Sequence, residues 1–106
     1  MNMAVKHLNP ETFAQAVESK VAMVDFWADW CQPCQSLLPV IDQLGEELDG
    51  KAVVGKVHVD ENKSLARQFG VMSIPTVVFF KDGKEVQRLV GVHPKQAYLD
   101  VIAQLG

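Results

Sequence analysis

Short apolar segments alternate with segments of helical periodicity along most of this chain, and this alternation restricts the fold more than any other feature. Residues 20–28 form a short, nearly continuous apolar run, and residues 52–59 form a second, valine-rich one. Between them, apolar residues recur at helical spacing up to a stop at Gly50: Leu37, Leu38, Ile41, Leu44 and Leu48. Continuous apolar runs indicate strands buried on both faces, whereas spacings of three and four indicate an amphipathic helix. A strand, a helix and a second strand in succession predict parallel strands in one sheet.

The remaining segments extend this pattern at both ends. Asn9-Pro10 predicts the start of a helix, because Asn caps helices and Pro fits the first helical position. A short helix is predicted over 62–69, and a hairpin over 76–90 because an Asp-Gly pair marks a tight turn there. Pro94 opens a final helix. We therefore predict an α/β fold in which one central mixed sheet of about five strands is flanked by four helices, in the order βαβαβαββα.

Length, composition and charge favour one small domain without nucleic-acid or membrane partners. The chain has 106 residues, 48% of them hydrophobic and 22% charged, which suits a single domain over residues 1–106. The net charge of −3 argues against nucleic-acid binding, which needs a basic face. No apolar run approaches the ~20 residues of a membrane helix, and the N-terminal residues lack the pattern of a secretory signal. We therefore expect a cytoplasmic protein, and a monomer because nothing indicates oligomerisation.

The only two cysteines, Cys31 and Cys34, lie between the first apolar run and the long helix. Free backbone N–H groups and the positive end of a helix dipole at this junction would favour a thiolate at Cys31. A lowered thiol pKa makes a nucleophile at neutral pH. Cys34 lies one turn further on, close enough to form a disulfide, and Pro33 keeps this small ring stiff. In a reducing compartment such a pair is typically redox-active or metal-binding.

Other roles for the cysteine pair have weaker support. A structural zinc site needs four ligands, and His7, His58 and His93 lack ligand-like spacing; we expect His58 to be a strand-edge residue instead. A c-type haem attachment needs a His where this chain has Gln35. A purely structural disulfide would close only a tiny loop and stabilise little. We therefore expect no bound metal, and redox catalysis is the favoured function.

A carboxylate, Asp25, stands in the middle of the apolar run that precedes the cysteines. An unpaired carboxylate in a sheet core is costly. Either the strand frays here and Asp25 reaches water, or Asp25 lies beneath the cysteine pair with a pKa raised by burial. A raised pKa suits a proton acceptor that works near pH 7, and we favour this second interpretation.

Several motifs occur together, in order and across nearly the whole chain: VDFWADWCQPC, Pro39, Lys56, Ser73-Ile74-Pro75-Thr76, FFKDG and Val90-Gly91. In this combination the chain resembles the thioredoxin family. The resemblance implies the thioredoxin fold and a protein-disulfide reductase, in which Cys31 attacks a substrate disulfide and Cys34 resolves the mixed disulfide. It also implies that Asp25 helps to take the Cys34 proton through water, with Lys56 as its partner. An ordinary surface lysine on a strand face remains the alternative for Lys56.

The resemblance further implies the partners of the reaction and the surface that binds them. Substrates would be disulfide-containing proteins, and electrons would come from a separate thioredoxin reductase, an NADPH-dependent flavoenzyme. The chain itself would bind no cofactor. It has no G-x-G-x-x-G motif with which to bind a nicotinamide. The implied substrate surface is an exposed apolar patch around Cys31: Trp30, Pro33, Ile74, Pro75, Gly91 and Val92.

Within this patch, Ile74-Pro75 forms a cis peptide in the family; the alternative is an ordinary trans proline before a strand. Backbone groups near Ile74 would pair with an extended substrate segment, and Gly91 would let that segment approach closely. Two further residues are expected to be structural. Trp27 packs beside the active-site loop, and Pro39 bends the long helix.

The chain departs from the usual family pattern at a few positions: Gln32 replaces Gly, Gln35 replaces Lys or Arg, Met72 stands where a basic residue is frequent, and His93-Pro94 replaces a small residue followed by Ser or Thr. Gln32 and Pro33 lie between the cysteines and should tune the redox potential. With this changed pair between the cysteines, we expect a potential less negative than usual. Separately, loss of positive charge at Gln35 should weaken thiolate stabilisation slightly. Two alternative functions remain: a thiol oxidase or isomerase, which needs an oxidising compartment, and a redox-inert binding subunit with the same fold.

Overall fold

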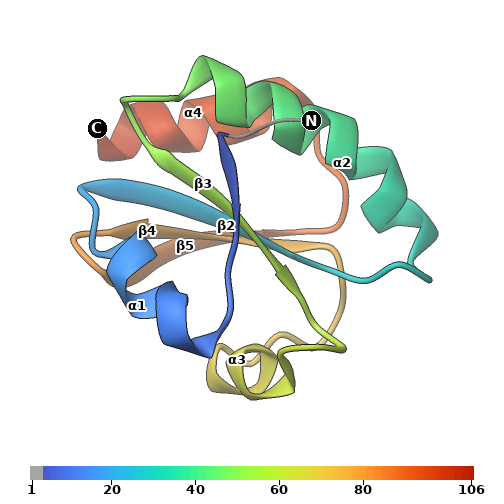
Figure 1. The fold of residues 1–106 in the computed structure, drawn as a ribbon. Helices are drawn as coiled ribbons and strands as arrows, with labels where there is room; N and C mark the ends of the chain where they lie inside the picture. Colours follow the sequence, from blue (N-terminus) through green and yellow to red (C-terminus); the bar gives the residue numbers. More distant parts are fainter. Residues whose placement is uncertain (1–3) are drawn as a thin grey trace.

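The computed structural model describes residues 4–106, and its centre is a five-stranded sheet (Figure 1). From one edge to the other the strands are β1 (Val5–His7), β3 (Val53–His58), β2 (Val21–Trp27), β4 (Thr76–Lys81) and β5 (Lys84–Val90). The first three are parallel, and β4 and β5 are antiparallel to their neighbours. The helices in this part of the chain are α1 (Pro10–Val17), α2 (Gln32–Glu47), α3 (Lys63–Gln68) and α4 (Lys95–Leu105). The predicted mixed sheet, its helices and their order are confirmed.

Helices cover both faces of the sheet, with α2 and α4 on one side and α1 and α3 on the other (Figure 1). The cluster under α2 and α4 includes Met23, Leu37, Ile41, Val54 and Tyr98, and the cluster over α1 and α3 includes Phe13, Val24, Phe26, Leu65 and Phe80. Side chains alternate along a strand, so β2 supplies Met23 to one cluster and Val24 to the other. This burial on both faces explains why the apolar run of β2 is continuous. Within residues 4–106, no helix has the length and apolar character that crossing a bilayer requires.

The local turn and cap signals act where the sequence predicts them. Asn9 caps α1, because its side-chain oxygen accepts hydrogen bonds from the backbone N–H groups of Glu11 and Thr12, each at 3.0 Å. Asp82 and Gly83 form the turn between β4 and β5 with φ values of 51° and 85°, the conformation that a tight hairpin needs. These local preferences fix where α1 begins and where the chain reverses into β5.

Three positions differ from the sequence-based expectations or refine them. His58 is the last residue of β3. It pairs with Trp27 of β2, but the pairing of β3 with β1 ends at Lys56, so His58 lies at a strand edge on that side only. Pro94 is the N-cap of α4 and the helix proper begins at Lys95, a difference of one residue. Pro39 lies exposed on α2, which continues through it as one helix. The bend expected at Pro39 stays a prediction.

Candidate active site

Cys31 stands where the chain leaves β2 and enters α2. It is the N-cap residue of α2, and the backbone N–H of Cys34 donates a hydrogen bond to its Sγ at 3.2 Å. The two cysteines form a disulfide, with Cα atoms 5.2 Å apart. Cys31 is 4% exposed and Cys34 is fully buried, so only the Cys31 sulfur is open to a partner. Backbone N–H groups and the dipole at a helix start are surroundings that favour a thiolate over a thiol.

Two other loops meet the chain at this sulfur. The Sγ atom of Cys31 lies 3.7 Å from the carbonyl oxygen of Ile74, and the Ile74-Pro75 peptide is cis, as predicted. The carbonyl oxygen of Pro75 in turn accepts a hydrogen bond from the Gly91 N–H at 2.8 Å. The loop before β4 and the turn after β5 are therefore fixed beside the start of α2. The remaining predicted surface residues extend from these three segments: Trp30 at 70% exposure, Val92 at 50%, and the exposed Pro33. The expectation that Pro75 is part of an exposed patch is wrong, because Pro75 is buried.

Asp25 is fully buried in the middle of β2, between Lys56 on β3 and Val77 on β4. It shares a face of the strand with Met23, and this face is covered by α2. Within residues 4–106, neither of its carboxylate oxygens has a hydrogen-bond partner. Burial therefore raises the pKa of Asp25 from 3.8 to about 7, and the positive charge of Lys56 lowers it only in part. The alternative of a frayed strand does not hold, because Asp25 is out of contact with solvent.

Lys56 is half-buried on the same side of the sheet as Asp25, its register partner. Its Nζ atom lies 5.2 Å from the ring centroid of Trp27, within the range of a cation–π contact. Trp27 follows Asp25 by two residues and so faces the same way. The edge of its ring also packs against His58, with centroids 4.9 Å apart. Trp27 thus anchors the end of β2 beneath the active-site loop. Lys56 lies against its ring and is half-buried, not fully exposed.

A group of polar contacts ties the loop after β2 to the segment after β3, and the sequence interpretation missed it. His58 Nε2 lies 2.9 Å from Asp29 Oδ2, and Trp30 Nε1 donates a hydrogen bond to Asp60 Oδ2 at 2.8 Å. Gln35 also donates to the backbone carbonyl of Asp29 at 3.0 Å. The sequence could have indicated that these two segments lie close together, because the segments that follow two adjacent parallel strands lie at the same end of a sheet.

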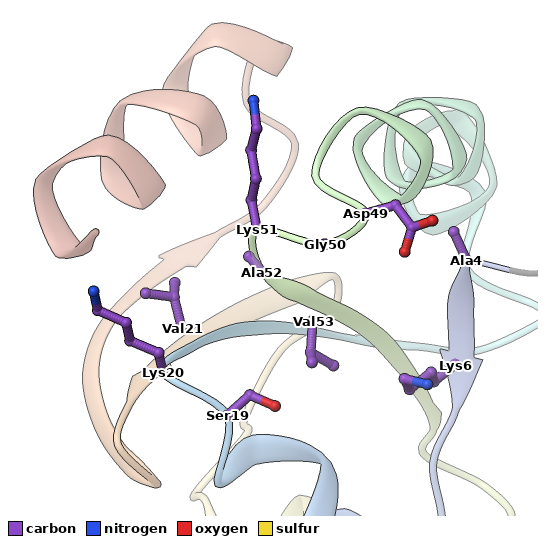
Figure 2. A pocket seen from close by; sticks show the side chains of 10 residues that line it. All are labelled: Ala4, Lys6, Ser19, Lys20, Val21, Asp49, Gly50, Lys51, Ala52 and Val53. Atoms are coloured by element: carbon purple, nitrogen blue, oxygen red, sulfur yellow. The ribbon is translucent and has the colours of Figure 1, made fainter.

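The described residues offer no cluster of metal ligands, and a cavity that they form lies away from the cysteine pair. In the part of the chain from Ala4 onward, no three His, Cys, Asp or Glu side chains are placed to hold a metal ion. A cavity of about 490 Å³ is instead lined by Ala4, Lys6, Ser19, Lys20, Val21, Asp49, Gly50, Lys51, Ala52 and Val53 (Figure 2). These residues lie around the beginnings of β2 and β3, whereas Cys31 follows the end of β2. The cavity therefore lies at the opposite ends of these strands from the disulfide.

A reversible disulfide at a helix start, open on the side of one sulfur, performs electron exchange with other thiols and disulfides, so the protein is a thiol–disulfide oxidoreductase. A family model described as Thioredoxin matches residues 4–104. The thioredoxins of Staphylococcus saprophyticus and Staphylococcus haemolyticus are 46% and 45% identical over 100 residues, covering 94% of this chain and 96% of each relative.

Solved structures agree with these sequence relatives. A mutant thioredoxin from Halobacterium salinarum matches with a TM-score of 0.88 at 39% identity, covering 95% of this chain and 89% of its own. The thioredoxin of Malassezia sympodialis matches with a TM-score of 0.86 at 34% identity, covering 94% and 89%. The chain belongs to the thioredoxin family, and its cysteine pair fits the role of a protein-disulfide reductase.

Proposed function

We propose that this protein reduces disulfides in target proteins by cycling Cys31 and Cys34 between dithiol and disulfide. The observation that carries the proposal is the disulfide at the start of α2, with one accessible and one buried sulfur. The Cys31 thiolate attacks a target sulfur, forms a mixed disulfide and releases the first target thiolate. Cys34 then attacks Cys31, releases the second target thiolate and restores the Cys31–Cys34 disulfide. Two electrons thereby pass from the protein to the target.

Asp25 is our candidate for the group that takes the proton of Cys34. A carboxyl group with a pKa of about 7 is ionised in a large fraction of molecules at neutral pH and can accept a proton there. Its oxygens have no partner among residues 4–106, which leaves them free to bind a water molecule that relays the proton. Lys56 would act as its positioning partner, since its charge keeps the pKa of Asp25 from rising further.

An extended target segment would bind across the three loops that meet at Cys31. Among the described residues, the Ile74 N–H has no hydrogen-bond partner, so it is available to pair with a target backbone. Gly91 has a φ of +83° and presents no side chain, so a target segment can pass close to it. The apolar contacts would come from Trp30, Pro33, Ile74 and Val92, while the buried Pro75 would support the loop beneath them.

The chain would act as one domain and as a monomer in the cytoplasm, without a bound cofactor. A separate thioredoxin reductase, an NADPH-dependent flavoenzyme, would return electrons to the disulfide. Gln32 and Pro33 between the cysteines would set the reduction potential. Equilibration with glutathione separates a reductase from an oxidase, because a potential close to that of strongly oxidising periplasmic proteins would contradict the proposed direction of electron flow.

Insulin reduction in the presence of dithiothreitol tests the function directly. The wild-type protein should precipitate the insulin B chain much faster than dithiothreitol alone, and Cys31→Ser should fall to the rate of dithiothreitol alone. Cys34→Ser should accumulate target proteins as mixed disulfides, because the resolving thiol is gone. Capture that persists in the double variant without Cys31 would show that the proposed nucleophile is wrong.

A further inference from the structure

Most of the large apolar side chains that are exposed lie close in the sequence to the residues that meet at the active-site sulfur. Those in the described part of the chain are Trp30, Met72, Val86, Val90 and Val92. All except Val86 lie within two residues of Cys31, Ile74 or Gly91 in the sequence. Met72 is the most exposed of them, at 96%, and it is not among the residues that the family resemblance places on the substrate surface.

The backbone that carries Met72 is held on both sides. The N–H of Val71 donates a hydrogen bond to the carbonyl oxygen of Ala66 at 2.9 Å, and the Val71 side chain packs against the core. On the other side, the carbonyl oxygen of Ser73 accepts a hydrogen bond from the Thr76 hydroxyl at 2.6 Å. Met72 is therefore presented to solvent by a fixed backbone, so only its side chain has to be ordered when a target binds.

Met72 lies within reach of a target bound at Cys31. The Ile74 carbonyl oxygen is 3.7 Å from the Cys31 sulfur, and Met72 is two residues earlier. Two residues of chain span at most about 7 Å. In an extended target segment along this loop, the residue two positions from the attacked cysteine is about 7 Å away and on the same side as that cysteine. This target residue would meet the Met72 side chain.

The surroundings of this contact favour an uncharged partner. The three segments that meet at Cys31, residues 30–41, 68–80 and 89–94, contain no Asp, Glu, Lys or Arg. Carboxylates occur on the Trp30 side, where Asp60 binds the indole of Trp30. Arg88 contacts one of these segments, but it donates its hydrogen bond to the Phe69 carbonyl and is already paired with Glu85. An apolar target side chain gains by burial against the flexible thioether of Met72, whereas a carboxylate would lose hydration without finding an unpaired cation in these segments.

We propose that Met72 is a specificity-determining residue, which selects target disulfides whose cysteine has an apolar residue two positions away. This inference rests on the proposed reductase function and names the class of target it prefers. The occupant of the surface is an extended, uncharged segment of the target protein. The reaction is unchanged: the target disulfide gains two electrons and becomes two thiols, while the dithiol of Cys31 and Cys34 is oxidised to the disulfide.

Symmetric peptide disulfides test this preference. Each consists of two copies of acetyl-X-Gly-Cys-Gly-X-amide joined through cysteine, with X as Leu, Gly or Glu, so that either chain direction presents X to Met72. Pre-reduced protein is mixed with excess peptide, and second-order rate constants are measured by acid quenching and chromatography. Partial burial of a Leu side chain should make the Leu peptide about fivefold faster than the Gly peptide with wild type. The Glu peptide should be the slowest.

Three variants show whether this preference depends on Met72. Met72→Ala should bring the Leu-to-Gly rate ratio close to one, and Met72→Lys should raise the Glu rate above the Gly rate. Val86→Ala removes another exposed apolar side chain, 47% exposed and outside the three loops, and should leave all ratios unchanged. A Leu-to-Gly ratio that is the same in wild type and Met72→Ala overturns the inference. A wild-type Gly rate no higher than that of Cys31→Ser overturns the reductase function instead.

Discussion

Replacement of Asp25 by Asn should stabilise the oxidised protein, and the gain should grow with pH. The pKa of Asp25 is about 7 in the folded protein against 3.8 for an ordinary aspartate in water, which approximates the unfolded chain. Below both values the carboxyl is protonated in both states and has no effect on stability. As the pH rises from about 4 to 7, the unfolded chain releases this proton while the folded protein retains it. Wild type therefore loses stability across this window, and the loss is complete once both states are ionised.

The size of this effect follows from the difference between the two pKa values. A tenfold difference in proton affinity corresponds to about 1.36 kcal/mol, so the shift from 3.8 to about 7 amounts to roughly 4 kcal/mol. Its main cause is the loss of water around a carboxylate whose oxygens find no partner among the described residues, and Lys56 offsets it only in part. This loss of stability is large compared with the free energy of unfolding of a typical protein, which is about 5–15 kcal/mol.

Urea unfolding of both oxidised proteins at pH 4 and pH 8.5 measures this effect. Asn also buries an unpaired amide, but that cost does not depend on pH and cancels between the two conditions. The stability of Asp25→Asn relative to wild type should therefore rise by roughly 3 to 4 kcal/mol from pH 4 to pH 8.5. Asp82→Asn, in the exposed hairpin turn, is the matched control and should show no comparable rise. A relative stability of Asp25→Asn that stays constant with pH would refute the raised pKa, and with it the assignment of the proton acceptor.

Two further substitutions test the surroundings of this site. Lys56→Met removes the charge that lowers the pKa of Asp25, so a carboxyl-carbon NMR titration should place that pKa above about 7; a fall would contradict the assigned contact. Tyr98→Phe removes the hydroxyl that accepts the His93 N–H at 3.2 Å, and should lower the free energy of unfolding by roughly 1 to 2 kcal/mol in urea. An unchanged unfolding midpoint would show that this bond does not hold the turn before α4.

Features set by neighbouring residues could be predicted from the sequence. The start of α1 depends on Asn9, whose side chain reaches N–H groups only two and three residues ahead. The reversal between β4 and β5 depends on two turn residues that adopt positive φ. The position of Cys31 at a helix start follows in the same way, because a continuous apolar run must end before a segment of helical periodicity begins. These features require no knowledge of which strands become neighbours.

Contacts between distant segments require that knowledge and could not be predicted. The pairing of His58 with Asp29 depends on β3 lying beside β2 in the register that sets Trp27 opposite His58. The bond from Trp30 to Asp60 depends on the same neighbourhood. The first strand has only three residues, too few to show a period. It forms because its backbone pairs with β3, whose residues are almost fifty positions further along the chain.

Asp25 and Met72 break the rule that apolar residues lie inside and polar residues outside, each in the opposite direction. Asp25 is a carboxyl group with no solvent exposure, and Met72 is an apolar side chain at 96% exposure. Local conflicts of this kind concentrate at functional sites, because a sequence chosen for stability alone would not retain them. At Asp25 the buried carboxyl group lowers stability by roughly 4 kcal/mol in alkaline solution. Its proposed function is to accept a proton at neutral pH. At Met72 an apolar side chain is exposed to water. Its proposed function is to contact a target, and this contact forms only when the target binds.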